Sequence, residues 1–247
     1  MSEPNATIAA RTRSRANTQK LTSRGMLTAI AYVVMLLSQA LPQVSGFLQM
    51  DLKDTVICIG GFLFGPVAAA TISIVVALVE MFTVSDTGII GLIMNVLATV
   101  SFCCTAAFVY KRNHTRKGAV IGLALGTIVL TIVMLLWNYL ITPIYMKLDR
   151  AVVAAMLPTV FLPFNVVKGG LNMALILVIY KPVVTALRKA RLVPESRGAQ
   201  AAGSTGILNG VPVDAQKAKW LNAGFILFTL ALLATFVTLT LVLMGIL

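Results

Sequence analysis

Six polar side chains stand out in this sequence because each interrupts a long apolar run: Glu80, Asn95, Asn138, Asn165, Lys168 and Asn172. An amide carries hydrogen-bond donors and an acceptor, and a lysine ammonium carries three donors. Within a membrane such groups cost roughly a few kcal/mol each, so each one is a candidate functional residue. Amides and one cation flanked by aromatic residues are typical of a pocket for a flat heterocycle with alternating donors and acceptors.

Three of these residues share one face of a predicted helix. Asn165, Lys168 and Asn172 are spaced i, i+3 and i+7, which places them on the same side of an α-helix. We place Lys168 in the first turns of that helix, where the helix dipole disfavours a cation. Its position therefore points to an acceptor nearby, either on a ligand or on a carboxylate such as Glu80.

Each of these residues also has a simpler interpretation that the sequence leaves open. Lys168 could extend its long stem to the membrane surface. The asparagines could form hydrogen bonds between helices. For Asn95 and Asn172 this interpretation is favoured over contact with a ligand. Glu80 could be structural and pair with a neighbouring hydroxyl or with Lys168.

The elements that position these residues must be membrane helices. Apolar residues make up 58% of the 247 residues and charged residues 11%, against roughly a quarter charged in soluble domains. The mean hydropathy is +0.92. A soluble fold of this length could not bury so many apolar residues, so we expect lipid to cover the remainder. The predicted class is an all-α membrane protein.

Apolar runs and turn residues predict seven helices, each near the length that a bilayer requires or somewhat shorter. They are 26–41, two helices within 55–84 separated at Gly65-Pro66, 89–110, 119–141, a helix from Pro158 or Pro163 to Tyr180, and 220–247. We divide the chain into a flexible basic cytoplasmic tail (1–24), a six-helix substrate-binding domain (25–190), a cytoplasmic linker (191–217) and a seventh helix (218–247). Residues 42–54 form a polar outer loop that includes Asp51, Lys53 and Asp54.

Charge placement predicts the orientation. The net charge is +12, and the basic residues gather at 11–24, 111–117 and 181–219. Basic residues in alternate loops indicate the cytoplasmic side of a membrane protein. The N-terminus is then cytoplasmic, the C-terminus extracellular, and the candidate residues lie toward the outer side. Nucleic-acid binding would require a continuous basic face with stacking aromatics, which is absent from the pattern.

Motifs for catalysis are missing. The sequence has no G-x-x-x-x-G-K-[ST] loop, no H-E-x-x-H, no G-x-S-x-G and a single histidine, His114. Cys58, Cys103 and Cys104 lie within apolar runs without metal-type spacing, as buried inert thiols do. We therefore predict a protein that is not an enzyme and holds no metal or cofactor.

Several short motifs resemble one known family. Leu52-Lys53-Asp54, Gly61-Phe62-Leu63-Phe64-Gly65-Pro66, Trp137-Asn138-Tyr139 with Pro143 and Tyr145, and Pro163-Phe164-Asn165-Val166-Val167-Lys168-Gly169 are similar to the substrate-binding S component of energy-coupling factor (ECF) vitamin transporters. The resemblance spans about 25–190, and the last two motifs resemble the riboflavin-specific branch. It implies a six-helix S-component fold with the vitamin near the outer side, bound by Asn138, Asn165 and Lys168. Glu80 and Asn95 are candidates from their position alone.

The resemblance also implies partners. An S component works with a transmembrane coupling subunit and two ATPases, and small residues on its first helix contact the coupling subunit. Gly25 and Ala29 have that small-x-x-x-small spacing here. The seventh helix departs from the six-helix pattern. Two alternatives stay open: an S component for another vitamin, and an intramembrane enzyme or assembly factor.

Overall fold

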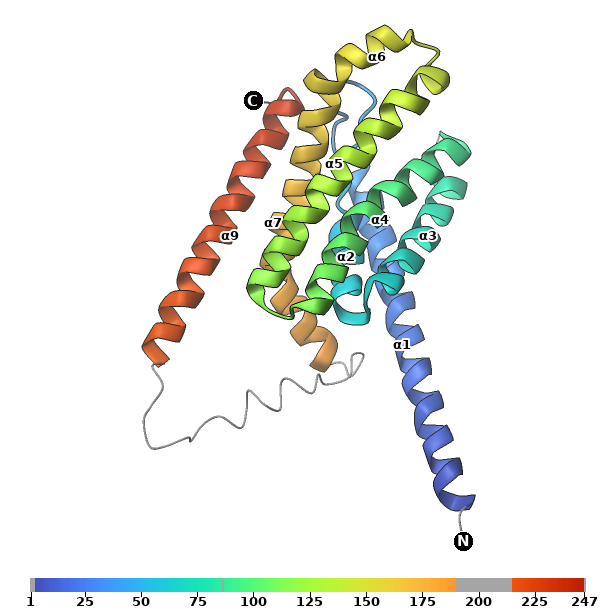
Figure 1. The fold of residues 1–247 in the computed structure, drawn as a ribbon, viewed down its shortest axis with the longest axis vertical. Coiled ribbons are helices and arrows are strands. Elements are labelled where there is room, and N and C mark those ends of the chain that lie inside the picture. Colours follow the sequence, from blue (N-terminus) through green and yellow to red (C-terminus); the bar gives the residue numbers. More distant parts are fainter. Residues whose placement is uncertain (1–2, 86, 190–214, 247) are drawn as a thin grey trace.

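The computed structural model describes residues 3–85, 87–189 and 215–246, and these residues form helices without a β-strand (Figure 1). The helices are α1 (Glu3–Ser38), α2 (Lys53–Phe64), α3 (Pro66–Thr83), α4 (Gly88–Arg112), α5 (Arg116–Met146), α6 (Arg150–Met156), the π-helical turn η1 (Leu157–Phe161), α7 (Leu162–Lys189) and α9 (Ala215–Leu243).

Six helical stretches of the described chain are long and apolar enough to cross a membrane. They are 17–38 within α1, α3, α4, α5, the run from α6 through α7, and 224–243 within α9. The shorter α2 lies among them. The predicted all-α membrane architecture, six helices in a bundle plus one terminal helix, is confirmed.

The bundle has two ends, which we name by their loops. The basic end carries residues 111–117 between α4 and α5, together with the last turns of α7 and the first turns of α9. The loop end carries residues 39–52, the turn 147–149 and the C-terminal end of α9 (Figure 1).

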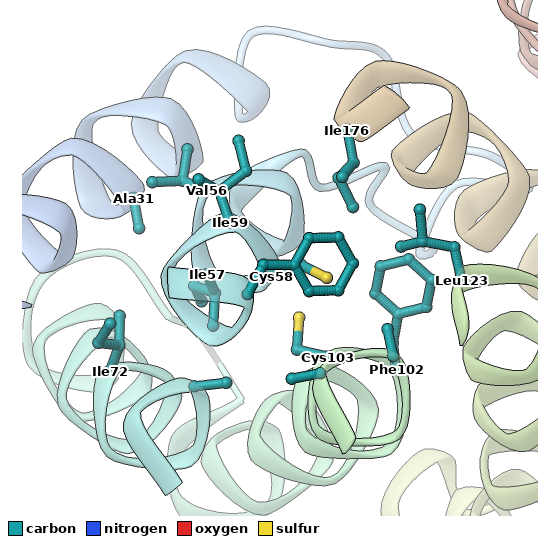
Figure 2. Close-up of a cluster of buried hydrophobic side chains, with 14 of the residues drawn as sticks. Ala31, Val56, Ile57, Cys58, Ile59, Ile72, Phe102, Cys103, Leu123 and Ile176 are labelled. Carbon is teal, nitrogen blue, oxygen red and sulfur yellow. The ribbon is translucent and has the colours of Figure 1, made fainter. Parts of the chain in front are cut away.

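α2 occupies the centre of the bundle. Ten of its twelve residues are buried, and it contacts α1, α3, α4 and α7. Figure 2 shows its side chains, Cys58 among them, facing residues of the surrounding helices such as Phe102 of α4 and Ile176 of α7. Cys58 and Cys103 are buried free thiols and Cys104 is half-buried, in agreement with the prediction of inert cysteines.

The predicted break between α2 and α3 is present at Gly65-Pro66. Gly65 has a φ of 93°, a conformation that favours glycine because it has no Cβ. Pro66 then opens α3, where its missing N–H has no helical partner to lose. These two residues reverse the chain in one step and bring α3 against the central helix.

Two predicted boundaries are wrong. The first helix, predicted to begin at Met26, begins at Glu3 and runs without a break to Ser38. Residues 5–24 contain neither glycine nor proline, and their alanines and arginines favour helix. Gly25 therefore lies inside a helix instead of at a boundary.

The sixth helix also begins earlier than predicted, at Arg150 instead of Pro158 or Pro163. The side chain of Asp149 accepts a hydrogen bond from the Ala151 N–H at 3.3 Å and caps the helix. The π-helical turn η1 then accommodates Pro158, which has no backbone N–H to donate. The wider turn changes which backbone carbonyl oxygens need a donor, so the missing N–H is tolerated. Lys168 consequently lies several turns inside a helical run, and an unfavourable helix dipole does not apply to it.

The predicted linker and the predicted seventh helix are described to different extents. Most of the predicted linker (191–217) falls outside the described residues. The predicted seventh helix (218–247) is present as α9, which begins at Ala215, ends at Leu243 and contacts α7.

Candidate functional site

A cavity of about 200 Å³ lies at the loop end of the bundle, above the first turn of α2. Side chains of α1, α3, α4, α5 and α7 form its walls. The loop 39–52 covers it with Gln43, Phe47 and Gln49. All five predicted substrate-binding residues line this one cavity: Glu80, Asn95, Asn138, Asn165 and Lys168. They come from four different helices, so the structure brings together what the sequence keeps apart.

The loop 39–52 is held closed by hydrogen bonds to the end of α1. The Gln49 side chain donates to the carbonyl oxygens of Ser38 (2.7 Å) and Leu41 (3.2 Å), and the Leu52 N–H donates to the Ser38 hydroxyl at 3.2 Å. The Phe47 ring meets the edge of Phe161 with 5.9 Å between centroids. The loop 39–52 thus lies over the cavity and covers it.

Asn165 and Lys168 present unused polar atoms to the cavity. Both side chains are buried, at 2% and 8% exposure. Asn165 Nδ2 donates to the Phe161 carbonyl at 2.8 Å, but among the described residues nothing donates to its Oδ1. The Lys168 ammonium likewise makes no hydrogen bond or ion pair within the described part of the chain. Its charge interacts with the carboxylates of Asp51 and Asp54 without a direct ion pair, and its hydrogen-bond donors remain available to a ligand.

Asn138 is partly committed to its own helix. Its Nδ2 donates to the Met134 carbonyl at 2.8 Å, and its Oδ1 accepts from the Thr142 hydroxyl at 3.0 Å. An amide has two donor hydrogens and two acceptor lone pairs. One of each remains for a ligand, and the two local bonds fix the direction in which they point.

Glu80 and Asn95 differ, because their side chains already bind protein partners. Glu80 accepts from the Lys53 ammonium at 2.5 Å and from Asn95 Nδ2 at 3.0 Å. Lys53 also pairs with Asp51 at 2.6 Å, so one cation joins two carboxylates. The suggested pairing of Glu80 with Lys168 is wrong, since Lys53 takes that place. A direct contact of Glu80 or Asn95 with a ligand stays a prediction.

The polar contacts continue below the cavity floor. The Thr99 hydroxyl donates to Asp54 at 2.7 Å, and the Thr55 hydroxyl donates to Asn172 Oδ1 at 2.7 Å. Asn172 Nδ2 donates to the carbonyl oxygens of Asp51 and Lys168. Asn172 does not line the cavity. It joins α7 to α2, as the hydrogen-bonding alternative predicted.

Sequence reasoning missed the burial of Asp51, Lys53 and Asp54, which it assigned to an exposed loop. All three are at most 6% exposed. The available signal was the sequence Asp51-Leu52-Lys53-Asp54 placed directly before an apolar run that is too short to span a membrane. Mixed charges there could pair with one another at the start of a central helix.

The other predicted contact residues lie far from the cavity. Gly25 and Ala29 are both exposed on α1, and a Cβ placed on Gly25 would meet no atom within 4 Å. Gly25 precedes Ser38 by thirteen residues, which is about 20 Å along a helix. They form part of an open surface nearer the basic end, separate from the cavity.

Comparisons with known proteins agree on one family. The sequence profile described as "ECF transporter, substrate-specific component" matches residues 19–184. The riboflavin transporter FmnP of Bacillus subtilis (strain 168) is 31% identical over 191 residues, covering 70% of this chain and 98% of FmnP. The riboflavin transporter RibU of Staphylococcus aureus (strain TCH60) is 30% identical over 178 residues, covering 69% of this chain and 93% of RibU.

A solved structure shows the same fold. It is described as the S component of a bacterial ECF transporter and matches with a TM-score of 0.60 and 29% identity. The match covers 69% of this chain and 98% of that chain. The family profile ends at residue 184, before α9 begins.

Proposed function

Because the chain belongs to the family of substrate-specific components of ECF transporters, a family of membrane transport subunits and not of enzymes, we propose that it binds riboflavin. The observation that carries this is the convergence of Asn138, Asn165 and Lys168 on one covered cavity, where polar atoms of all three remain available. The names of the relatives as riboflavin transporters support the same ligand.

The chemistry of the cavity suits the flavin ring. The pyrimidine-like edge of the ring alternates donors and acceptors, which an asparagine amide can match with its N–H and its carbonyl oxygen. The Lys168 ammonium can donate to the ring's carbonyl oxygens. Phe47 and Phe164 line the same cavity and offer apolar surface to the flat ring.

The orientation follows from the charges. The 111–117 segment, at one end of the bundle, carries Lys111, Arg112, Arg116 and Lys117, and positively charged loops stay in the cytoplasm. The loop end with its cavity then faces the outside, with the N-terminus cytoplasmic and the C-terminus of α9 extracellular. Riboflavin would enter from the outside beneath the loop 39–52.

Movement of the vitamin requires partners. We assign these as a transmembrane coupling subunit and two ATPase subunits of an ECF module, since the chain itself has no ATP-binding loop. The exposed Gly25 and Ala29 would contact the coupling subunit, because small residues allow two helices to approach closely.

Purification of the full chain from membranes tests the proposed ligand. We expect yellow protein with flavin absorbance, and quenching of riboflavin fluorescence when the stripped protein is titrated. Quenching that riboflavin competitors reverse would support the assignment. Colourless protein that leaves riboflavin fluorescence unchanged would overturn it and favour an S component for another vitamin.

A further inference from the structure

A second region of open space lies at the basic end of the bundle. Two adjoining cavities, of about 170 and 240 Å³, share three lining residues: Arg116, Leu177 and Phe225. These residues come from α5, α7 and α9. The cavities therefore form one cleft, bounded on one side by the helix that the family profile does not include.

The cleft exists because α7 and α9 diverge. Toward the loop end the two helices are in close contact: a Cβ on Gly170 would lie 2.2 Å from the Phe236 ring, so only glycine leaves room for that ring. Leu233 and Phe236 of α9 pack there against a core that includes Val167 and Leu171. Toward the basic end the ribbons separate (Figure 1), and the cleft opens in that wedge.

The walls of the cleft are apolar along most of its length. Leu177, Val178, Ile226 and Leu230 line the cavity between the two helices. The hydroxyls of Tyr110 and Tyr180, 3.0 Å from each other, belong to the adjoining cavity, and Arg116 lines both. The Arg116 guanidinium lies over the Phe225 ring, 5.5 Å from its centroid. An occupant must therefore be apolar over most of its length and polar at one end.

The charge at the polar end is positive. Lys111, Arg112, Arg116 and Lys117 lie within seven residues of one another, and the sequence has no acidic residue from 87 to 148. Basic pockets between transmembrane helices at the cytoplasmic surface bind anionic lipid head groups. A small soluble anion could bind at Arg116 but would leave the apolar walls uncovered.

We propose that the cleft between α7 and α9 binds one anionic phospholipid, with its phosphate at Arg116 and one acyl chain between Leu177 and Ile226. The lipid fills the wedge that the diverging helices leave and joins α9 to the bundle at the basic end, as Phe236 and Gly170 join it at the loop end. The site is separate from the vitamin cavity. The orientation proposed above decides only in which leaflet of the membrane this lipid lies.

Native mass spectrometry of the full chain tests this site. Delipidated protein in mild detergent is given equal amounts of phosphatidylglycerol and phosphatidylcholine with identical acyl chains. We expect one retained lipid with a preference of about fivefold to tenfold for phosphatidylglycerol. Arg116→Gln should abolish the preference. The matched control Arg112→Gln should keep it, because Arg112 stacks on Phe108 and does not line the cleft.

A second variant tests the apolar part. Leu177→Trp fills the cleft and should reduce retention of both lipids by about tenfold, with the folded protein checked by gel filtration. Equal loss of preference in both arginine variants, no preference in the wild type, or unchanged retention in Leu177→Trp would each overturn the proposal. The count of bound lipid requires no riboflavin, so failure of the proposed ligand would leave this result independent.

Discussion

Two groups of buried polar side chains lie within a few helical turns of each other and differ in what they bind. In the first group, which we call the cavity group, Asn165 and Lys168 have polar atoms that bind no described residue, and Asn138 keeps one donor hydrogen and one lone pair beyond its two local bonds. In the second group, the ion network, Asp51, Lys53 and Glu80 are buried, Asn95 is half-buried, and the four bind one another. Polarity within apolar runs made the cavity group, Glu80 and Asn95 candidates in the sequence, whereas Asp51 and Lys53 were found only in the structure.

The difference between the two groups shows which buried polar groups the folded protein pairs by itself and which it leaves for a ligand. The ion network places two carboxylates around one ammonium, so its direct ion pairs form without a ligand and one negative charge remains in excess. In the cavity group the charge of Lys168 interacts with Asp51 and Asp54, but its ammonium makes no hydrogen bond to a described residue, and a protein keeps such a cost where function needs it. Glu80 and Asn95 line the same cavity, yet Glu80 binds Lys53 and Asn95 binds Glu80.

Removing the central cation of the ion network should have the largest effect. Lys53→Met leaves Asp51 and Glu80 buried without their partner, and breaking a buried pair in this way costs about 3–5 kcal/mol. We expect a large fall in the thermal unfolding temperature in detergent, while Lys117→Met at an exposed position leaves it unchanged. Equal stability of the two variants would show that the network is not structural.

Changes in the cavity group should affect binding more than stability. Asn165→Ala and Lys168→Ala should each weaken riboflavin binding by about tenfold or more, which corresponds to about 1.4 kcal/mol. Fluorescence titration measures the affinity, and Val166→Ala, on the exposed side of α7, is the control. If both variants bind like the wild type, Lys168 and Asn165 return to the snorkelling and hydrogen-bonding roles.

Asn95→Ala tests the border between the two groups. Its amide donates to Glu80, so we expect a loss of about 1 kcal/mol of stability. Because its Nδ2 is held by Glu80 within the ion network, riboflavin affinity should fall by less than about threefold. The opposite result, a large loss of affinity at constant stability, would make Asn95 a direct ligand and move it into the cavity group.

Truncation after Arg197 should have the smallest effect. It removes α9, which contributes no residue to the cavity beneath the loop 39–52, and the relative FmnP corresponds to the remaining body over 98% of its length. We expect riboflavin affinity to stay within about twofold of the full chain. A marked loss would mean that the α9 residues packed behind Phe164 are needed to shape the cavity.

The sequence predicted the helices better than the contacts between them. Apolar length and the Gly65-Pro66 pair were sufficient for the fold class and for the break between α2 and α3. The same rules misplaced the start of the sixth helix, because a π-helical turn tolerates Pro158 and no local pattern announces it. Polarity within apolar runs found the five cavity residues. The partner of Glu80 could not be found that way, because Lys53 lies 27 positions away and only the fold over α2 brings it near.

The shortness of α2 limits how much of the membrane thickness this helix fills. Twelve residues of α-helix extend about 18 Å, whereas the hydrocarbon core of a bilayer is about 30 Å thick. Surrounded by longer helices, α2 fills only part of that thickness. The cavity beneath the loop 39–52, which Asp51 lines just before α2 begins, lies at one end of this short helix. An insertion of one helical turn into α2 would raise the floor by about 5.4 Å and remove much of the space beneath the loop 39–52.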